Sequence, residues 1–521
     1  MVYKSTYPDI EIPYCTVAEM ALRKAASIPD KVALVDATSG DKLTYGQLKA
    51  HAERVAAWLA EEGFVKGDRV MLWAPNTIWY PVLFHGVTMA GCVATTANSL
   101  YTPEEIAHQL KDSGARAIVT IAAFLDRAKA AHALQPVDRI VVLDGAEDYP
   151  DLQTILSSTA PLPTVEIDPS VDLAVLPYSS GTTGLPKGVM LTHENLVANV
   201  AQCEVMMSAM GEDAVVLAVL PFFHIYGLTV LMNLTLAQGA EVVTMPRFDL
   251  EGFLQAIQDH KVTKVYVAPP ILVALAKHPV VDRYDLSSLR SITSGAAPLD
   301  EALALAVEAR LGVPVMQGFG MTELSPVSHT VPDALAGELP RGSVGVSLPN
   351  IQCRLVDVET GKDAEQGAEG ELWIKGPNVM VGYLNNEAAT AETIVDGGWL
   401  RTGDIASYDP QNGVYVITDR LKELIKYKGY QVAPAELEAV LLTHDDITDS
   451  AVIGVPDEEG GEAPKAFVVR RPGATITEDE IKTWIAGIVA PHKKIRHVEF
   501  VDEVPKSSSG KILRKDLRSR G

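Results

Sequence analysis

The segment that most constrains the fold is a glycine- and hydroxyl-rich loop that directly follows an apolar, strand-like run. The run covers residues 172–178 and leads into Tyr178-Ser179-Ser180-Gly181-Thr182-Thr183-Gly184-Leu185-Pro186-Lys187-Gly188-Val189. Glycines let backbone N–H groups turn toward an anion, hydroxyls donate hydrogen bonds, and Lys187 adds a positive charge. We therefore predict a polyphosphate site at the carboxyl end of a strand.

The spacing of this loop does not fit the Walker pattern, which needs four residues between its glycines and a Gly-Lys-Ser/Thr ending. Ordinary P-loop kinases and GTPases are therefore disfavoured. Taken alone, the segment also fits a flexible surface loop.

The net charge and the cysteine content argue against nucleic-acid-binding, disulfide-bonded and zinc-binding proteins. The chain has 521 residues and a net charge of −23, so its surface repels nucleic acid and anionic membranes. Its four cysteines are far apart and form no CxxC pair, which predicts reduced thiols rather than disulfides or a zinc site. The N-terminus lacks an apolar signal region, no apolar run reaches about 18 residues, and the last three residues are not a peroxisomal signal. We expect a cytoplasmic protein without a membrane span.

Strand-like and helix-like runs alternate along most of the chain, which predicts α/β layers with parallel strands. The strand and helix pairs are expected at 69–73 and 79–90, at 117–121 and 124–131, and at 264–268 and 270–277. A chain of this length suggests about two to four domains or subdomains. The fold class is therefore α/β, with a large N-terminal domain of layered subdomains.

The character of the chain changes near residue 419, where a charged segment precedes a compact helix, strand, strand, helix, strand pattern. Helices are predicted at 435–444, after Pro434, and at 478–489, and strands at 450–455 and 465–470. We place a hinge near Lys422. The expected domains are residues 1–421 and a small, mobile α+β domain of residues 422–521.

Further motifs follow the glycine loop in order: Pro221-Phe222-Phe223-His224-Ile225-Tyr226-Gly227, Ser294-Gly295-Ala296-Ala297-Pro298, Gln317-Gly318-Phe319-Gly320-Met321-Thr322-Glu323, Trp399-Leu400-Arg401-Thr402-Gly403-Asp404 and Ser509-Gly510-Lys511. Together they resemble the adenylate-forming superfamily, which includes acyl-CoA synthetases and luciferases. Within it the chain is most similar to 4-coumarate:CoA ligases and bacterial cinnamate:CoA ligases. The resemblance covers almost the whole chain.

The resemblance implies a site for ATP and Mg²⁺. It assigns the triphosphate to Ser179, Ser180, Gly181, Thr182, Thr183 and Lys187, and further nucleotide contacts to Gln317, Gly318 and Phe319. Thr322 is implied to contact the α-phosphate, and Glu323 is the implied Mg²⁺ ligand, because hard cations prefer oxygen ligands. Without its motif, Glu323 would fit an ordinary surface carboxylate.

The ribose is implied to bind Asp404, whose carboxylate offers two acceptor oxygens, with Arg420 as a second ribose or phosphate contact. Phe319 departs from the family pattern, where tyrosine is usual. Its ring can still stack on adenine, but a contact through a phenolic oxygen is lost. This departure puts the strength of nucleotide binding in doubt.

Residues of the small domain are implied to act in two alternating states. Lys511 would bridge the substrate carboxylate and the α-phosphate, and rotation about Lys422 would replace it with the segment 426–432. Coenzyme A contacts are implied for Lys426, Lys428, Gly429 and Gln431, and for Arg247 at the CoA phosphates. A lysine as close to a chain end as Lys511 is otherwise usually just solvated.

The acyl pocket is implied to use small and aromatic residues: His224, Tyr226, Val230, Ala296, Gly318, Gly320, Pro326 and Val327. His224 would act as a gate at the pocket, although a histidine after an apolar run also fits a core position. Glycines and alanines leave a flat slot suited to an aromatic ring, and Tyr226 offers one polar tip.

These features predict an ATP-dependent carboxylate:CoA ligase that forms an acyl-AMP intermediate, with 4-coumarate or a related aryl-propenoic acid as the expected substrate. The alternatives are a medium- or long-chain fatty acyl-CoA synthetase, a luciferase-like oxygenase and an enzyme that loads a carrier protein. A nucleotide-binding protein without activity would not need Lys511, Glu323 and Asp404. The sequence indicates neither the oligomeric state nor a base for the CoA thiol.

Overall fold

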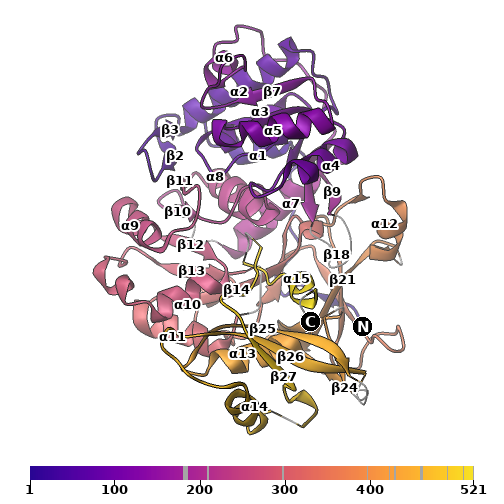
Figure 1. Ribbon diagram of the computed structural model, residues 1–521. Coiled ribbons are helices and arrows are strands. Elements are labelled where there is room, and N and C mark those ends of the chain that lie inside the picture. Colours follow the sequence, from indigo (N-terminus) through magenta and orange to yellow (C-terminus); the bar gives the residue numbers. More distant parts are fainter. Residues whose placement is uncertain are drawn as a thin grey trace.

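The computed structural model describes residues 1–179, 186–207, 211–295, 299–395, 397–421, 423–427, 430–457, 461–489, 491–507 and 510–519 (Figure 1). For residues 419, 420, 426, 430, 431 and 461 it describes the backbone only. Within these ranges the longer strands form four sheets.

The first sheet carries the end of the predicted phosphate loop. Its strands lie in the order β19 (Gly382–Tyr383), β9 (Lys187–Thr192), β8 (Leu173–Ser179), β5 (Val93–Thr96), β4 (Arg69–Leu72), β6 (Ala115–Thr120) and β7 (Arg139–Val142). The strands from β8 to β7 are parallel, whereas β9 and β19 are antiparallel to their neighbours. The expected strand 172–178 is confirmed as β8, which ends at Ser179, where the glycine-rich segment begins in the sequence.

The second sheet is parallel at its centre. Its strands lie in the order β16 (Val346–Ser347), β15 (Val327–Thr330), β14 (Val315–Gly320), β13 (Ser291–Ser294), β12 (Lys264–Val267), β10 (Val215–Ala218), β11 (Glu241–Thr244), β2 (Val32–Asp36) and β3 (Lys42–Thr44). Strands from β14 to β2 are parallel, and the outer pairs at both edges are antiparallel.

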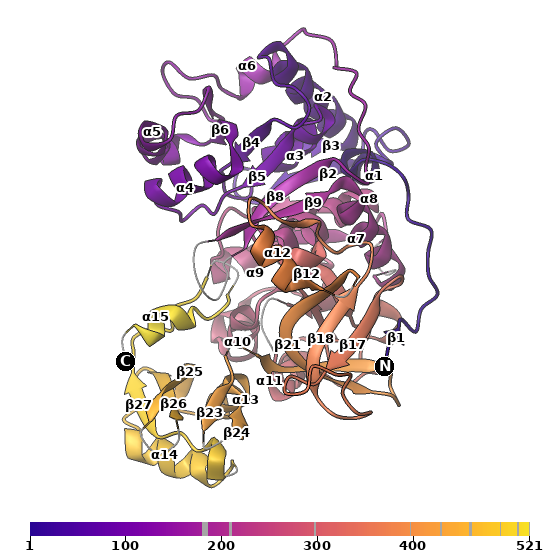
Figure 2. The ribbon, with the colours of Figure 1, turned by 90° about the vertical axis from the view of Figure 1, so that its right-hand side faces the viewer.

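Helices between the two sheets form a buried layer (Figures 1 and 2). They are α1 (Val17–Leu22), α3 (Trp79–Met89), α7 (His193–Met206), the π-helix η2 (Gly227–Leu234) and α8 (Thr235–Ala237). Most residues of α7 are buried, as expected of a helix that packs against elements on several sides. Further helices surround the sheets: α2 (Tyr45–Glu61), α4 (Pro103–Ser113), α5 (Leu125–Leu134), α6 (Leu152–Leu156), α9 (Leu250–His260), α10 (Pro269–Lys277) and α11 (Glu301–Leu311).

Local sequence signals explain where several helices begin and end. Helix α4 starts with a capping box between Thr102 and Glu105 and has Pro103 in its first turn. It ends at Gly114, whose φ of 64° is left-handed and therefore suits glycine. The expected alternation of strands and helices is confirmed at β4 and α3, β6 and α5, and β12 and α10, with ends shifted by a few residues.

A third, antiparallel sheet was not predicted. Its strands are β1 (Tyr3–Lys4), β17 (Gln352–Val356), β18 (Gly370–Lys375), β21 (Trp399–Asp409) and β20 (Ile394–Val395), with β22 (Val414–Arg420) paired to β21. Helix α12 (Glu387–Thr393) precedes β20. The N-terminal strand pairs with a strand about 350 residues later, so no local pattern indicates this sheet.

The C-terminal residues form a small α+β unit with its own hydrophobic core, at the lower left of Figure 2. Its elements are β23 (Ile425–Tyr427), β24 (Tyr430–Val432), α13 (Pro434–Leu442), β25 (Ile447–Asp457), β26 (Gly461–Arg470), α14 (Glu478–Ala486), β27 (His497–Phe500) and α15 (Arg514–Arg518). The predicted helix and strand order is confirmed, and the hairpin of β23 and β24 is an addition. The boundary at residue 421 and the hinge at Lys422 remain predictions, because Lys422 lies outside the described residues.

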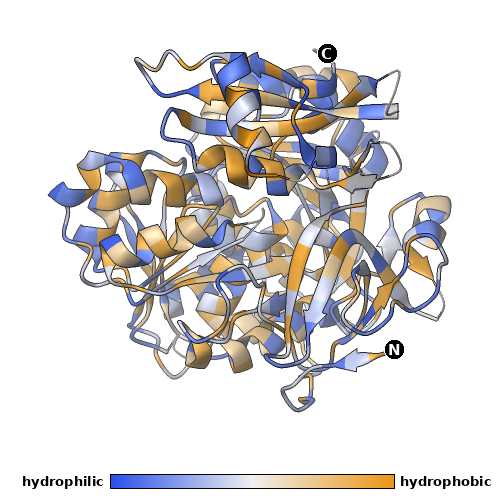
Figure 3. Cartoon of the chain, turned by 90° about the horizontal axis from the view of Figure 1, so that it is seen from below, coloured by the Kyte–Doolittle hydropathy of each residue, from blue (hydrophilic) through white to orange (hydrophobic). Residues whose placement is uncertain are grey.

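The distribution of hydropathy agrees with this layered architecture. In Figure 3 hydrophobic stretches lie mainly along the strands and helices, and hydrophilic stretches lie mainly in the outer loops. Among the described residues, no helix combines the length and the apolar character that a membrane crossing requires.

Candidate active site

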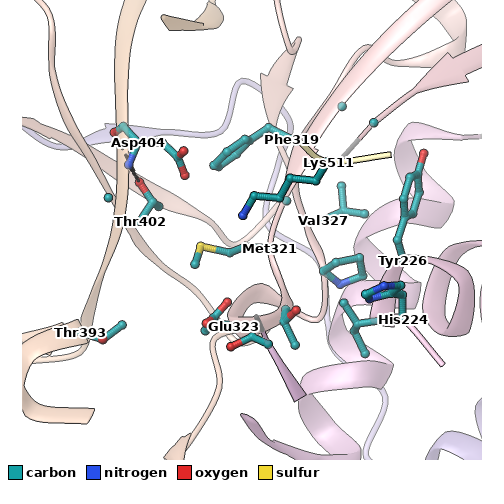
Figure 4. A pocket seen from close by; sticks show the side chains of 18 of the residues that line it. His224, Tyr226, Phe319, Met321, Glu323, Val327, Thr393, Thr402, Asp404 and Lys511 are labelled. Carbon is teal, nitrogen blue, oxygen red and sulfur yellow. Dashed lines mark hydrogen bonds between the residues drawn. The ribbon is translucent and has the colours of Figure 1, made fainter. Parts of the chain in front are cut away.

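A cavity of about 490 Å³ lies where the two large sheets, the antiparallel sheet and the C-terminal unit meet (Figure 4). Its wall includes Ser179 and Lys187 from the first sheet, Phe319 to Glu323 at the end of β14 and just beyond it, and Asp404 from β21. Lys511 of the C-terminal unit completes the wall. Residues separated by more than 300 positions therefore face one space.

The phosphate end of the cavity is built by β8 and β9. Ser179 ends β8 and Lys187 begins β9, so the two residues are direct strand partners. The Lys187 ammonium nitrogen lies 4.2 Å from the ring centre of Tyr383, which is a cation–π distance. Ser180, Gly181, Thr182 and Thr183, which were predicted to bind phosphate, lie outside the described residues.

Glu323 faces the same end from a short 3₁₀ turn, η4 (Thr322–Leu324). The hydroxyl of Tyr383 donates a 2.8 Å hydrogen bond to Oε1 of Glu323. Burial and the Glu323 charge raise the pKa of Tyr383, so it stays protonated and remains a donor at neutral pH. Thr322, beside Glu323, also lines the cavity.

The donor set at this end fits a magnesium ion that is shared with a nucleotide. Mg²⁺ usually binds to one or two carboxylates together with substrate phosphates, and Glu323 supplies one carboxylate. No cluster of three or more metal-ligating side chains occurs in the described part of the chain. An all-protein metal cage is therefore not expected among those residues.

Asp404 lies on the opposite wall, where β21 pairs with β22. Its backbone N–H donates to Oγ1 of Thr402 at 3.0 Å, and the residue opposite it in the ladder is Arg420. The side chain of Arg420 lies outside the described atoms. Phe319 lines the cavity on the Asp404 side in Figure 4, and its ring centre is 6.0 Å from that of buried His329. A planar base could stack on Phe319 while its ribose reaches Asp404.

Lys511 enters the cavity from the C-terminal unit. Figure 4 shows its ammonium group between Asp404 and Met321. Its backbone N–H donates to Oγ of Ser507 at 3.1 Å, and Gly510 before it has a φ of 82°. A Cβ at Gly510 would lie only 2.8 Å from Cβ of Ala268, so glycine allows the close approach of this loop to α10.

The acyl end is formed by His224, Tyr226, Tyr266, Met207 and Val327. Burial lowers the pKa of His224 to about 4, so its imidazole is neutral at physiological pH. The rings of Tyr226 and Tyr266 meet edge to face with centres 6.3 Å apart.

Three glycines allow close packing in the wall at this end of the cavity. The glycines are Gly295, Gly318 and Gly320, and Pro326 lies beside them in the wall. A Cβ at Gly295 would lie 2.8 Å from the Tyr226 ring, and one at Gly320 would lie 2.2 Å from the carbonyl oxygen of Pro326. The predicted substrate residue Ala296 lies outside the described residues.

Three predicted site residues do not line the cavity. Gln317 is buried behind the wall, where its amide accepts from the backbone of Leu299 and donates to the carbonyl of Arg341. Val230 is fully buried in η2, and Arg247 is exposed beyond β11. The predicted roles of these residues stay predictions.

The predicted coenzyme A segment is only partly described. Lys426 pairs with Gln431 across the hairpin of β23 and β24, but their side chains are not described. Lys422, Lys428 and Gly429 lie outside the described residues.

Several cavity residues were not assigned from the sequence: Tyr383, Glu371, Arg401, Tyr266 and Met207. Arg401 and Thr402 belong to the motif that ends at Asp404, so the motif itself was a signal for them. Glu371 follows a glycine in a short apolar run, and Tyr383 lies 60 residues after Glu323 along the chain. No pattern in the sequence links either residue to the site.

The chain belongs to the AMP-binding enzyme family. The family model for AMP-binding enzymes matches residues 22–384, and the model for the C-terminal domain of these enzymes matches residues 436–511. These two matches cover both the phosphate end of the cavity and the unit that carries Lys511.

Among curated proteins, the chain is similar to 4-coumarate--CoA ligase 5 of Oryza sativa subsp. japonica, with 43% identity over 528 residues that cover 100% of this chain and 97% of the relative. Among solved structures it resembles ATP-bound MatB of Rhodopseudomonas palustris, with a TM-score of 0.87, 31% identity and coverage of 96% and 98%. It also resembles the anthranilate CoA ligase AuaEII in complex with anthranoyl-AMP, with a TM-score of 0.90, 28% identity and coverage of 98% of each chain.

Proposed function

We propose that the protein is an AMP-forming acid:CoA ligase that acts on 4-coumarate or a related aryl-propenoic acid. The observation that carries the proposal is the position of Lys511 in the cavity. On one side of it lie Asp404 and Phe319, which are expected to bind the nucleotide, and on the other lies the acyl end with His224 and Tyr226. The full-length similarity to 4-coumarate--CoA ligases supports the same activity. The substrates are then a carboxylic acid, ATP and coenzyme A.

In the first step the substrate carboxylate attacks the α-phosphorus of ATP, the bond to the β-phosphate breaks, and acyl-AMP and pyrophosphate form. The barrier comes from repulsion between anions and from charge on the phosphoryl oxygens. Lys511 and Lys187 offset this charge, and Thr322 donates to the α-phosphate. Glu323 would hold a magnesium ion, which neutralises phosphate charge when bound.

In the second step the CoA thiol attacks the acyl carbon, AMP leaves, and a thioester forms. The sulfur nucleophile belongs to CoA, so no protein cysteine is required. We propose that the C-terminal unit rotates near Lys422 between the steps, so that Lys426, Lys428, Gly429 and Gln431 replace Lys511. Arg247 would contact the CoA phosphates. The family resemblance supports this second state.

An aromatic acid suits the shape of the acyl end. The aromatic rings of Tyr226 and Tyr266 line this end beside the small residues Gly295 and Gly318, and flat aromatic walls suit a planar ring better than a folded chain. The neutral imidazole of His224 fits a gate beside a negatively charged substrate without forming an ion pair. All four cysteines are free, which supports a reducing compartment, and we propose the cytoplasm.

The proposal is tested by two assays on the same preparation. Exchange of labelled pyrophosphate into ATP should depend on an added carboxylic acid, because adenylation is reversible. Release of AMP with formation of a thioester should then require CoA. Exchange without any CoA-dependent thioester would support adenylation but contradict the ligase assignment.

A further inference from the structure

The carboxylate of Glu371 on β18 gathers four hydrogen bonds at the edge of the cavity. Oε2 accepts from the indole N–H of Trp373 at 2.9 Å and from Nε and Nη2 of Arg401 at 3.2 and 3.1 Å. Oε1 accepts from the backbone N–H of Gly403 at 3.2 Å. The side chain of Glu371 is only 5% exposed, so these donors compensate the burial of its charge.

The bond to Gly403 fixes the segment of Thr402, Gly403 and Asp404, a bulge in β21 that is called the turn below. Gly403 has a φ of 72°, and its carbonyl accepts from the N–H of Leu421 at 2.8 Å. Thr402 holds the turn on its other side, since its hydroxyl donates to the carbonyl of Leu372 at 2.7 Å and accepts from the N–H of Asp404 at 3.0 Å. The N–H and the carbonyl of Gly403 are therefore both hydrogen-bonded, and Glu371 is the side chain that accepts from the N–H.

We propose that Glu371 is a positioning residue for nucleotide binding. It holds the turn of Thr402, Gly403 and Asp404 so that the Asp404 carboxylate meets the ribose hydroxyls of ATP. The inference rests on the proposed function, because it takes Asp404 as the ribose contact. Glu371 acts through the turn and need not touch the nucleotide.

The Glu371→Gln variant separates this role from a general contribution to stability. An amide has one acceptor oxygen, and three N–H donors at Oε2 will hold that oxygen on the side of Arg401 and Trp373. The amide NH₂ group then faces the N–H of Gly403, and two donors repel each other. Strand β18 keeps its shape, whereas the turn before Asp404 loses the hydrogen bond from Gly403 to Glu371.

The measurement is the ratio of the dissociation constants of 2′-deoxy-ATP and ATP, obtained by isothermal titration calorimetry of the full chain without carboxylic acid. Loss of a hydrogen bond to a charged group costs about tenfold in affinity, so the unaltered protein should prefer ATP by about that factor. Glu371→Gln should weaken ATP binding and lower the ratio by about threefold or more. Asp404→Ala should lower the ratio as well.

Arg354→Met is the matched control, because Arg354 lies 5.4 Å from the ring centre of Trp373 but does not line the cavity. It should leave the ratio unchanged even if the melting temperature falls. If Glu371→Gln does not fold, Glu371→Asp is measured instead, since its shorter side chain cannot hold Arg401 and Gly403 together.

The outcomes distinguish the inference from the proposed function. A lower ratio in both Asp404→Ala and the Glu371 variant supports the inference. A lower ratio in Asp404→Ala but an unchanged one in the Glu371 variant overturns the role of Glu371 alone. An unchanged ratio in Asp404→Ala removes the ribose assignment, and the inference falls with it.

Discussion

Tyr383 donates a 2.8 Å hydrogen bond to Glu323 and places its ring 4.2 Å from the ammonium nitrogen of Lys187. One tyrosine therefore contacts both the carboxylate expected to bind Mg²⁺ and the lysine expected to bind the triphosphate. Tyr383 is on β19, which pairs with β9 directly beyond Lys187, so the contact follows from sheet pairing. This relationship gives a test of the phosphate end of the cavity.

Tyr383→Phe should raise the Mg²⁺ concentration needed for half-maximal pyrophosphate exchange. The change removes the bond that orients Glu323 but keeps the ring beside Lys187, so we expect an increase of about threefold to tenfold with little change in the KM for ATP. Tyr383→Leu should also raise the KM for ATP. Tyr408→Phe on β21 is the control, and an equal Mg²⁺ requirement in all variants would remove Tyr383 from this role.

Lys511→Ala should separate the two half-reactions. The lysine charge stabilises the transition state of adenylation, so acyl-AMP formation should slow by about a hundredfold or more. Attack of CoA on supplied acyl-AMP should change little, and Lys515→Ala, at an exposed position of α15, should affect neither step. Rapid-quench assays of each half-reaction measure this. Equal losses in both steps would contradict the alternation of Lys511 with the segment 426–432.

Gly295→Ala should weaken binding of the acid without affecting ATP. The added Cβ would lie 2.8 Å from the Tyr226 ring, so this ring, which lines the acyl end, must shift. We expect the KM for the acid to rise by about tenfold, within the usual cost of overpacking. Gly342→Ala is the control, because a Cβ there meets nothing within 4 Å. An unchanged KM for every acid would show that the acyl end does not hold the substrate.

Acid should destabilise the protein partly through His85, which is fully buried in α3. Its two ring nitrogens have no hydrogen-bond partner among the described residues, and burial lowers its pKa to about 3. Between pH 6.5 and pH 3 the unfolded chain binds this proton and the folded chain does not, so stability rises with pH in that window and is complete above it. At pH 5 the loss is about 2 kcal/mol.

His85→Leu should therefore show a smaller drop in its urea midpoint from pH 7 to pH 5 than the unaltered protein. His497→Leu, at an exposed position, should keep the full drop. The same drop in all three proteins would mean that His85 is protonated in the folded state at pH 5.

The sequence predicts those features that depend on neighbouring residues. Strand β8, the alternating helices and the elements of the C-terminal unit follow from local periodicity and caps. The contact of Glu371 with Gly403 depends on the pairing of β18 with β21, and that of Tyr383 with Glu323 spans 60 residues. Such contacts arise from tertiary packing, which local patterns do not contain.

The same dependence on tertiary packing explains why Gln317 and Val230, which were predicted at the site, do not line the cavity. Gln317 is buried in β14, where its amide accepts from the N–H of Leu299 and donates to the carbonyl of Arg341, so these backbone groups occupy it instead of a ligand. Val230 lies in η2, where a π-helical segment changes which side chains face the cavity.

The central claim is tested most directly by comparing kcat/KM for 4-coumarate, cinnamate and octanoate, with AMP release measured in the presence of ATP, Mg²⁺ and CoA. The account predicts that at least one aryl acid exceeds octanoate by about tenfold, which is about 1.4 kcal/mol in transition-state binding. If octanoate instead exceeds both aryl acids by that factor, the aromatic assignment is wrong and the protein is a fatty acyl-CoA synthetase.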